Sequence, residues 1–70
     1  MPVVRTEVAG NVWKVEVAVG QRVAAGDPLV IVESMKMEIP VQAPVDGTVT
    51  GIAVTKGDRV AEGAAVVTLG

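Results

Sequence analysis

The sequence predicts an all-β fold, a sandwich or small barrel built from two similar halves. Valine occurs 17 times in 70 residues, and one tryptophan is the only aromatic side chain. This balance favours strands, because β-branched side chains fit a pleated sheet and lose rotamer freedom in a helix. Turn signals recur every six to ten residues without helical periodicity. An internal repeat is the third observation that predicts the fold.

The repeat appears when the chain is aligned with itself at an offset of 37 residues. Residues 10–33 then lie over residues 47–70 without a gap, and nine of the 24 aligned positions are identical. Composition alone would give roughly two or three identities, so the match indicates a structural duplication. The repeated glycines are the strongest evidence for the duplication, because each should mark a backbone position that a side chain would obstruct. The identical pairs are Gly10/Gly47, Val12/Val49, Val17/Val54, Gly20/Gly57, Arg22/Arg59, Val23/Val60, Ala24/Ala61, Gly26/Gly63 and Val30/Val67.

The elements of the first half follow from this alignment. NVWKVEV, residues 11–17, alternates in part between apolar and polar side chains, which predicts a strand. Turns containing glycine follow at VGQRV and AGDP, and the apolar run LVIV predicts a closing strand. The second half repeats these elements as TVTGIAV, KGDRV, EGAA and VVTL. Two equal halves predict a pseudo-twofold axis, with each half supplying strands to both sheets.

The segment between the repeats, SMKMEIPVQAPVD over residues 34–46, lacks the glycine that a tight hairpin turn usually contains. The run LVIV before this segment and the run EIPV inside it lie close enough to pair as a hairpin. Its tip then holds Met35, Lys36 and Met37, where glycine is usual because tight turns need positive φ. Positive φ at Met35 or Lys36 would cost on the order of 1 kcal/mol per residue. Proline cannot donate to a strand ladder, so Pro40 and Pro44 predict an edge strand.

Length and composition exclude several classes of function. We expect one domain over residues 1–70, too small for separate cofactor and substrate clefts, so a complete enzyme is not expected. Cysteine and histidine are absent, which removes disulfides, thiol and imidazole chemistry and the usual zinc ligands. No catalytic residue and no metal site is therefore predicted.

Charge and hydropathy also restrict the partners. The net charge is −2 and no basic cluster occurs, so nucleic acid is not expected to bind. No apolar run approaches the roughly 18 residues of a membrane helix, and no membrane partner is expected. The N-terminal MPVVRTE lacks the apolar core of a signal peptide, so we expect a cytoplasmic protein.

Lys36 differs from the other lysines of the chain in its neighbours. Lys14 and Lys56 have no distinctive flanking residues, whereas Lys36 has methionine on both sides. Methionine is flexible and polarizable and is common on surfaces that fit a partner. The tip is therefore predicted to be recognised by another protein. The alternative is that Met35 and Met37 belong to the core on a slightly longer strand. Neighbouring carboxylates of Glu33 and Glu38 favour the charged ammonium, so an external enzyme is expected to deprotonate Lys36.

The tip also resembles a known family. Glu33-Ser34-Met35-Lys36-Met37 is similar to the Glu-Ala-Met-Lys-Met signature of biotin carboxyl carrier domains, within the biotin/lipoyl attachment family. The resemblance covers nearly the whole chain, and GNVWKV is most similar to standalone attachment proteins and to carrier segments of urea carboxylases. It implies a flattened barrel, a barrel-sandwich hybrid of two four-stranded antiparallel sheets, with biotin joined to Lys36 by an amide. Some relatives carry a thumb insertion in the first half; the gapless repeat predicts none here.

The resemblance implies a non-catalytic carrier with three protein partners. A biotin protein ligase would attach the biotin and recognise Glu33, Ser34, Met35 and Met37. The tethered biotin would then carry a carboxyl group between the sites of a biotin carboxylase and a carboxyltransferase. Two alternatives share the fold: a lipoyl carrier, which typically has Asp-Lys-Ala at the tip, and an unmodified hairpin module like those of efflux membrane-fusion proteins. Neither the carboxyl acceptor nor the oligomeric state follows from the sequence.

Overall fold

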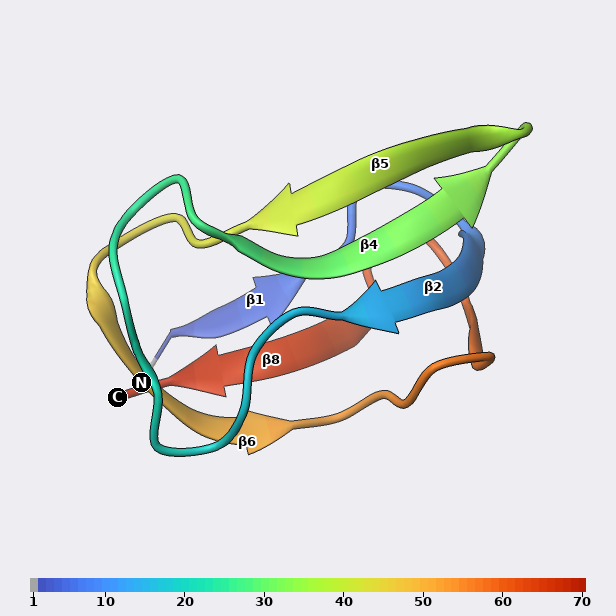
Figure 1. Cartoon of the computed structure of the whole chain (residues 1–70). Coiled ribbons are helices and arrows are strands. Elements are labelled where there is room, and N and C mark those ends of the chain that lie inside the picture. The colour runs from blue at the N-terminus through green and yellow to red at the C-terminus, as the bar shows by residue number, and fades with distance from the viewer. Residues whose placement is uncertain (1) are drawn as a thin grey trace.

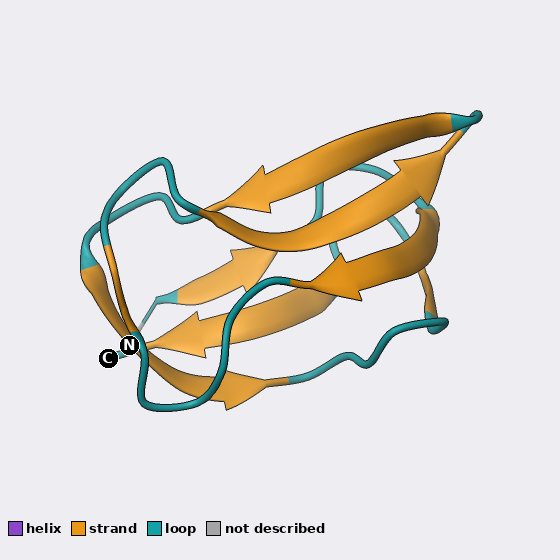
Figure 2. Cartoon of the chain, viewed as in Figure 1, coloured by secondary structure: helices purple, strands orange, loops and turns teal. Residues whose placement is uncertain are grey.

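The computed structural model describes residues 2–70; Met1, the first residue of the predicted domain, lies outside them. This range holds eight strands and no helix (Figure 1; Figure 2). They form two four-stranded antiparallel sheets, in the orders β1-β8-β6-β3 and β5-β4-β2-β7. The predicted fold class is confirmed, as two separate sheets rather than a closed barrel. The strands are β1 (Val3–Arg5), β2 (Gly10–Val15), β3 (Arg22–Val23), β4 (Pro28–Ser34), β5 (Met37–Gln42), β6 (Gly47–Ile52), β7 (Arg59–Val60) and β8 (Ala65–Leu69).

The two halves of the chain are interleaved between the sheets. Strands β1 and β3 of the first half join β6 and β8 of the second, while β2 and β4 join β5 and β7. The strand pairing repeats at the sequence offset of 37 residues. Val12 pairs with Val32, and their counterparts Val49 and Leu69 pair in the other sheet. The bulge that follows Val12 recurs after Val49, so the backbone obeys the pseudo-twofold relation even at its irregularities.

The equivalence extends beyond residues 10–33 and 47–70. Strand β1 has no counterpart in the elements that the sequence predicts, yet Val4 pairs with Val67 as Val41 of β5 pairs with Val30. Val4 and Val41 are 37 residues apart and both are buried. The end of β5 is therefore the structural equivalent of β1 in the other sheet. Only the hairpin tip that precedes it lies outside the duplicated framework.

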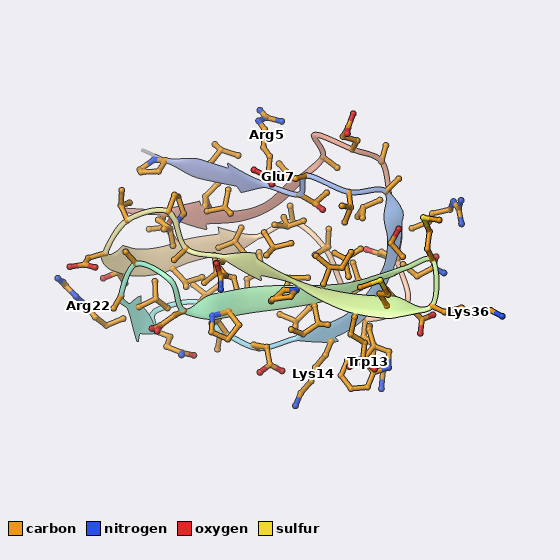
Figure 3. The ribbon with its side chains drawn as sticks, turned by 90° about the horizontal axis from the view of Figure 1, so that it is seen from above. Arg5, Glu7, Trp13, Lys14, Arg22 and Lys36 are labelled. Carbon is orange, nitrogen blue, oxygen red and sulfur yellow. The ribbon has the colours of Figure 1, made fainter. Side chains whose placement is uncertain are left out.

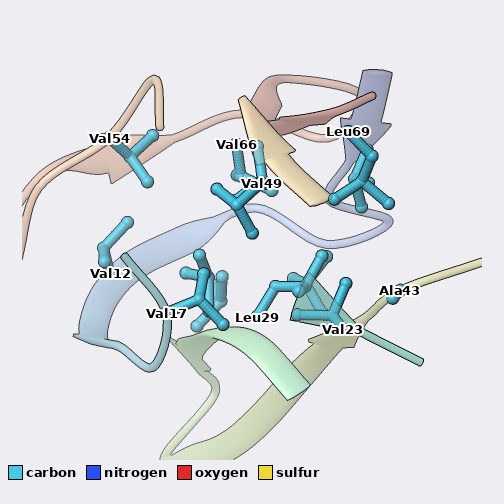
Figure 4. Close-up of a cluster of buried hydrophobic side chains, with 14 of the residues drawn as sticks. Val12, Val17, Val23, Leu29, Ala43, Val49, Val54, Val66 and Leu69 are labelled. Carbon is cyan, nitrogen blue, oxygen red and sulfur yellow. The ribbon is translucent and has the colours of Figure 1, made fainter. Parts of the chain in front are cut away.

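The core fills the space between the two sheets, with side chains from both pointing toward one another (Figure 4). Apolar burial drives this packing, and β-branched valine suits the inner faces of a sandwich. The one buried polar residue of residues 2–70 is Thr6, whose hydroxyl donates to the Val8 carbonyl (2.8 Å) and accepts from the Val8 N–H (3.2 Å). The core consists of Val4, Val12, Val17, Val23, Leu29, Val30, Val32, Val41, Ala43, Val49, Val54, Val60, Val66, Val67 and Leu69.

Equivalent turns tie the two sheets together. Gly20 and Gly57 have φ values of 93° and 96°, a conformation that strains any residue with a side chain. The Gly20 N–H donates to the Val49 carbonyl (2.7 Å), and the Gly57 N–H donates to the Val12 carbonyl (2.8 Å). Each turn thus bonds to the central strand of the opposite half. The predicted glycine turns are confirmed at both positions.

The β4–β5 hairpin extends from the end of the domain opposite the C-terminus (Figure 1). At the other end the Leu69 N–H donates to the Pro2 carbonyl (2.9 Å), which holds the two ends of the described chain together. Strand β5 is an edge strand, as Pro40 predicts. A firmly paired β4 inside the sheet therefore supports the hairpin, while its tip projects freely.

Candidate functional site

A two-residue turn, Met35-Lys36, joins β4 to β5 between the paired residues Ser34 and Met37. The φ angles of Met35 and Lys36 are 51° and 64°, and no other residues except glycines have positive φ among residues 2–70. Positive φ at both central residues is what a type I′ turn requires, and the twist of this turn matches the twist of the two paired strands. The predicted positive φ is confirmed, and at both residues. Backbone strain is therefore concentrated at the lysine that the sequence singles out.

The methionines of the tip do not belong to the core. Met35 is 92% exposed and Met37 is 64% exposed, so the alternative that they are core residues is wrong. Lys36 is exposed as well, and its side chain points away from the body of the domain (Figure 3). The tip thus presents one primary amine between two flexible apolar side chains. Such a surface is suited to recognition by a partner protein.

A polar row crosses the outer face of the sheet just behind the tip. Glu38, Glu33, Asn11 and Arg59 are successive partners across β5, β4, β2 and β7, and directly opposed residues share a face. All four are exposed, while Val12 and Val32 on the alternate positions are buried. The two carboxylates lie on the side of the row nearer the edge strand β5. Sequence reasoning found the carboxylates but missed Asn11 and Arg59, because only the strand order brings them alongside.

The other two lysines also lie near one another. Trp13, Lys14 and Lys56 all line an open groove of about 600 Å³ beside β2. Lys14 pairs with Glu16 at 3.2 Å, the single ion pair within residues 2–70. Neither Lys14 nor Lys56 lies on a turn between paired strands with apolar flanks, as Lys36 does. Sequence reasoning gave these lysines no distinctive neighbours, and the groove is a feature that it missed.

The described part of the chain contains no group of three acidic, cysteine or histidine side chains that could hold a metal ion. None of its elements is a helix long and apolar enough to cross a membrane. The chemistry of the site is thus that of an accessible amine on a supported hairpin. An amine of this kind can form an amide with a carboxylic acid once that acid has been activated.

Comparison with known proteins gives a family for this arrangement. Residues 1–69 match the Biotin_lipoyl family, described as "Biotin-requiring enzyme". The chain belongs to this family. The domain that defines this family carries a covalently attached cofactor and is not itself a catalyst. The predicted family, the requirement for covalent biotin and the non-catalytic role are confirmed.

Relatives of two sizes share this domain. The "Biotinylated protein TB7.3 homolog" of Mycobacterium leprae is 47% identical over 60 residues, which are 86% of this chain and 84% of the relative. The pyruvate carboxylase of Staphylococcus aureus is 46% identical over 57 residues, 81% of this chain but 5% of that enzyme. The Kluyveromyces lactis urea carboxylase structure superposes with a TM-score of 0.93 at 38% identity, covering 97% of this chain and 6% of that chain. The Biotin_lipoyl domain thus occurs both in a protein of similar length and as a small part of large carboxylases.

Proposed function

We propose that this chain is a biotin carboxyl carrier and that Lys36 holds the biotin through an amide bond to its Nζ atom. The observation that carries the proposal is the hairpin tip, where Lys36 stands exposed on a strained two-residue turn between two exposed methionines. The tip fits the cofactor, because an unhindered amine is what acylation by the biotin carboxyl group requires. Lys36 also has no ion-pair partner among residues 2–70 that would block its amine.

A biotin protein ligase is the proposed partner for attachment. Met35 and Met37 offer flexible apolar contacts on either side of the amine, and Glu33 and half-buried Ser34 lie on the paired strand that supports it. Since β4 is hydrogen-bonded on both sides, by β5 and β2, these residues keep a fixed arrangement. We propose that the ligase recognises this rigid hairpin as a shape, supplies the base that deprotonates Lys36, and provides the activated biotin.

The loaded domain would serve a biotin carboxylase and a carboxyltransferase in the cytoplasm. When bound, biotin supplies the atom that carries the carboxyl group between the two active sites. The domain supplies a tether, which raises the local concentration of the cofactor to the order of mM without a stable docking interface. The hairpin projects from the end opposite Pro2 and Leu69, so the tip can enter an active site while the rest of the domain stays outside.

The test is the intact mass of the protein after incubation with biotin, ATP and a biotin ligase, with peptide fragmentation to locate the adduct. One biotinyl amide is expected on Lys36, and Lys36→Ala should abolish it while leaving the thermal unfolding transition unchanged. Lys14→Arg and Lys56→Arg are matched controls that should still be modified once. An adduct on another lysine, or exclusive modification by a lipoate ligase in a parallel reaction, would contradict the proposal.

A further inference from the structure

Trp13 interrupts the symmetry of the two halves. It occupies the bulge of β2, is 45% exposed and does not belong to the core. The equivalent bulge of β6 holds Thr50, whose hydroxyl bonds to the Thr68 hydroxyl at 3.1 Å. The two bulges share one backbone register but have different side chains. The fold therefore does not require an indole at this position, and Trp13 is available for another task.

The groove beside Trp13 has the chemistry of a small-molecule site. Its volume of about 600 Å³ lies within the range of ligand pockets, which combine apolar walls with a few polar groups. No carboxylate lines it, so it suits a group with an apolar body and a hydrogen-bond acceptor. Lys56 has no ion pair within the described residues and can donate to such an acceptor. The apolar walls include Trp13, Ile52 and Val54, and the polar groups are Lys14, Thr55 and Lys56.

The groove lies within reach of Lys36. Val12 and Lys14, on either side of Trp13, pair with Val32 and Ile31 on the strand that leads to the tip. Four to five residues separate these partners from Lys36, roughly 13–16 Å along β4, and Trp13 lies one strand spacing of about 4.8 Å to the side, so the path is roughly 14–17 Å. A lysine side chain extended by the acyl chain of biotin spans a comparable length. Figure 3 shows Trp13 between Lys14 and Lys36 along the domain.

We propose that the Trp13 groove binds the bicyclic ring of the biotin carried by Lys36 while the biotin is in neither active site. We call this binding site the seat. This inference depends on the proposed function. The ring would pack against the indole, and the ureido oxygen would accept a hydrogen bond from Lys56 or Thr55. Because a short tether gives an effective concentration of the order of mM, a seat with a dissociation constant near 1 mM would be about half occupied. Binding of this strength would shield the biotin ring from solvent between reactions and would still release it readily to an active site.

The experiment compares the unmodified and the biotinylated domain, each verified by mass. Trp13 is the sole tryptophan, so its fluorescence reports on this groove alone. We expect biotinylation to shift the emission to shorter wavelength and to lower acrylamide quenching by up to about half, as half occupancy requires. Amide NMR shifts should change at Ile52, Thr55 and Lys56, with Arg22 at the far end as the unmoved reference. In Trp13→Thr, which copies the residue of the second half, biotinylation should leave those three amides unchanged.

Each other outcome counts against the seat in a recognisable way. If mass confirms the adduct but emission, quenching and the three amides do not change, the seat is wrong and the carrier function stands. If the changes grow with protein concentration, the groove binds a second copy of the chain instead. If no adduct forms on Lys36, both the carrier function and the seat fail.

Discussion

Glu33 and Glu38 lie directly opposite each other on the β4–β5 hairpin, just behind the turn that presents Lys36. Like charges in directly opposed positions destabilise an antiparallel pair. Both side chains are exposed, and the single ion pair within residues 2–70 involves neither of them. The hairpin therefore holds its carboxylates at some cost in stability. This arrangement suits a surface that a partner with basic side chains recognises.

Replacing Glu38 by glutamine should raise the free energy of unfolding by about 0.2–1 kcal/mol, because the opposed charge is removed. Urea denaturation measures the change. The gain should shrink as salt is added, since ions screen the repulsion between exposed charges. Glu62→Gln is the control, because Glu62 is exposed in a turn and has no opposed residue in a ladder. A loss of stability in Glu38→Gln would show that the carboxylate has a favourable contact instead.

Truncating either methionine of the tip should affect modification far more than stability. Met35→Ala and Met37→Ala remove exposed side chains, so unfolding should change by less than about 0.5 kcal/mol. The rate of biotinylation by a ligase should fall, because the apolar contacts beside Lys36 are lost. Leu29→Ala, at a fully buried position, should cost about 2–5 kcal/mol and calibrates the assay. A comparable loss in either methionine variant would place that side chain in the core.

The turn itself stores strain that a substitution should relieve. Met35→Asn should raise the free energy of unfolding by about 0.5–1 kcal/mol, because asparagine tolerates positive φ better than methionine does. Thermal unfolding monitored by circular dichroism measures the gain. Met37→Asn is the matched control: Met37 starts β5, where asparagine is unfavourable, so this variant should lose stability. Equal effects in the two variants would mean that the turn is not strained.

A pair of equivalent glycines provides a further comparison. A Cβ atom on Gly10 would overlap the backbone oxygen of Glu33, whereas one on Gly47 would lie 3.2 Å from the Gly70 oxygen. Gly10→Ala should therefore cost about 2–3 kcal/mol and Gly47→Ala about 1 kcal/mol or less, as measured by urea denaturation. The Gly10 variant should also be modified more slowly, because Glu33 must shift behind the tip. Equal losses would show that the halves differ less than their contacts indicate.

The sequence predicted those features that depend on local chemistry or on the repeat. Valine content, the glycine turns and the offset of 37 residues predict the strands and their pseudo-twofold arrangement. The Met35-Lys36 tip is predictable because it breaks the usual turn chemistry, and a local conflict of this kind often marks a functional position. Strand β1 is not, since three residues carry little periodicity and its pairing with β8 spans almost the whole chain.

Features that depend on strand order could not be predicted. The row of Glu38, Glu33, Asn11 and Arg59 exists because β7 flanks β2, a neighbour relation that no local pattern encodes. The sequence predicts only that Trp13 belongs to a strand, within residues 11–17. Its exposure follows from the bulge between Val12 and Lys14, and its proximity to Lys56 follows from the packing of the two halves.

The interleaving of the halves also bears on how such a domain could have arisen. One half of the chain, β1 to β4 or β5 to β8, supplies two strands to each sheet, so an isolated half would leave both sheets incomplete. A second, identical copy could supply the missing strands, because the register is the same at the offset of 37 residues. Two copies of a half-length peptide could therefore complete both sheets as a symmetric homodimer. Gene fusion would then have joined the end of one copy to the start of the other, and this junction is the hairpin that presents the lysine.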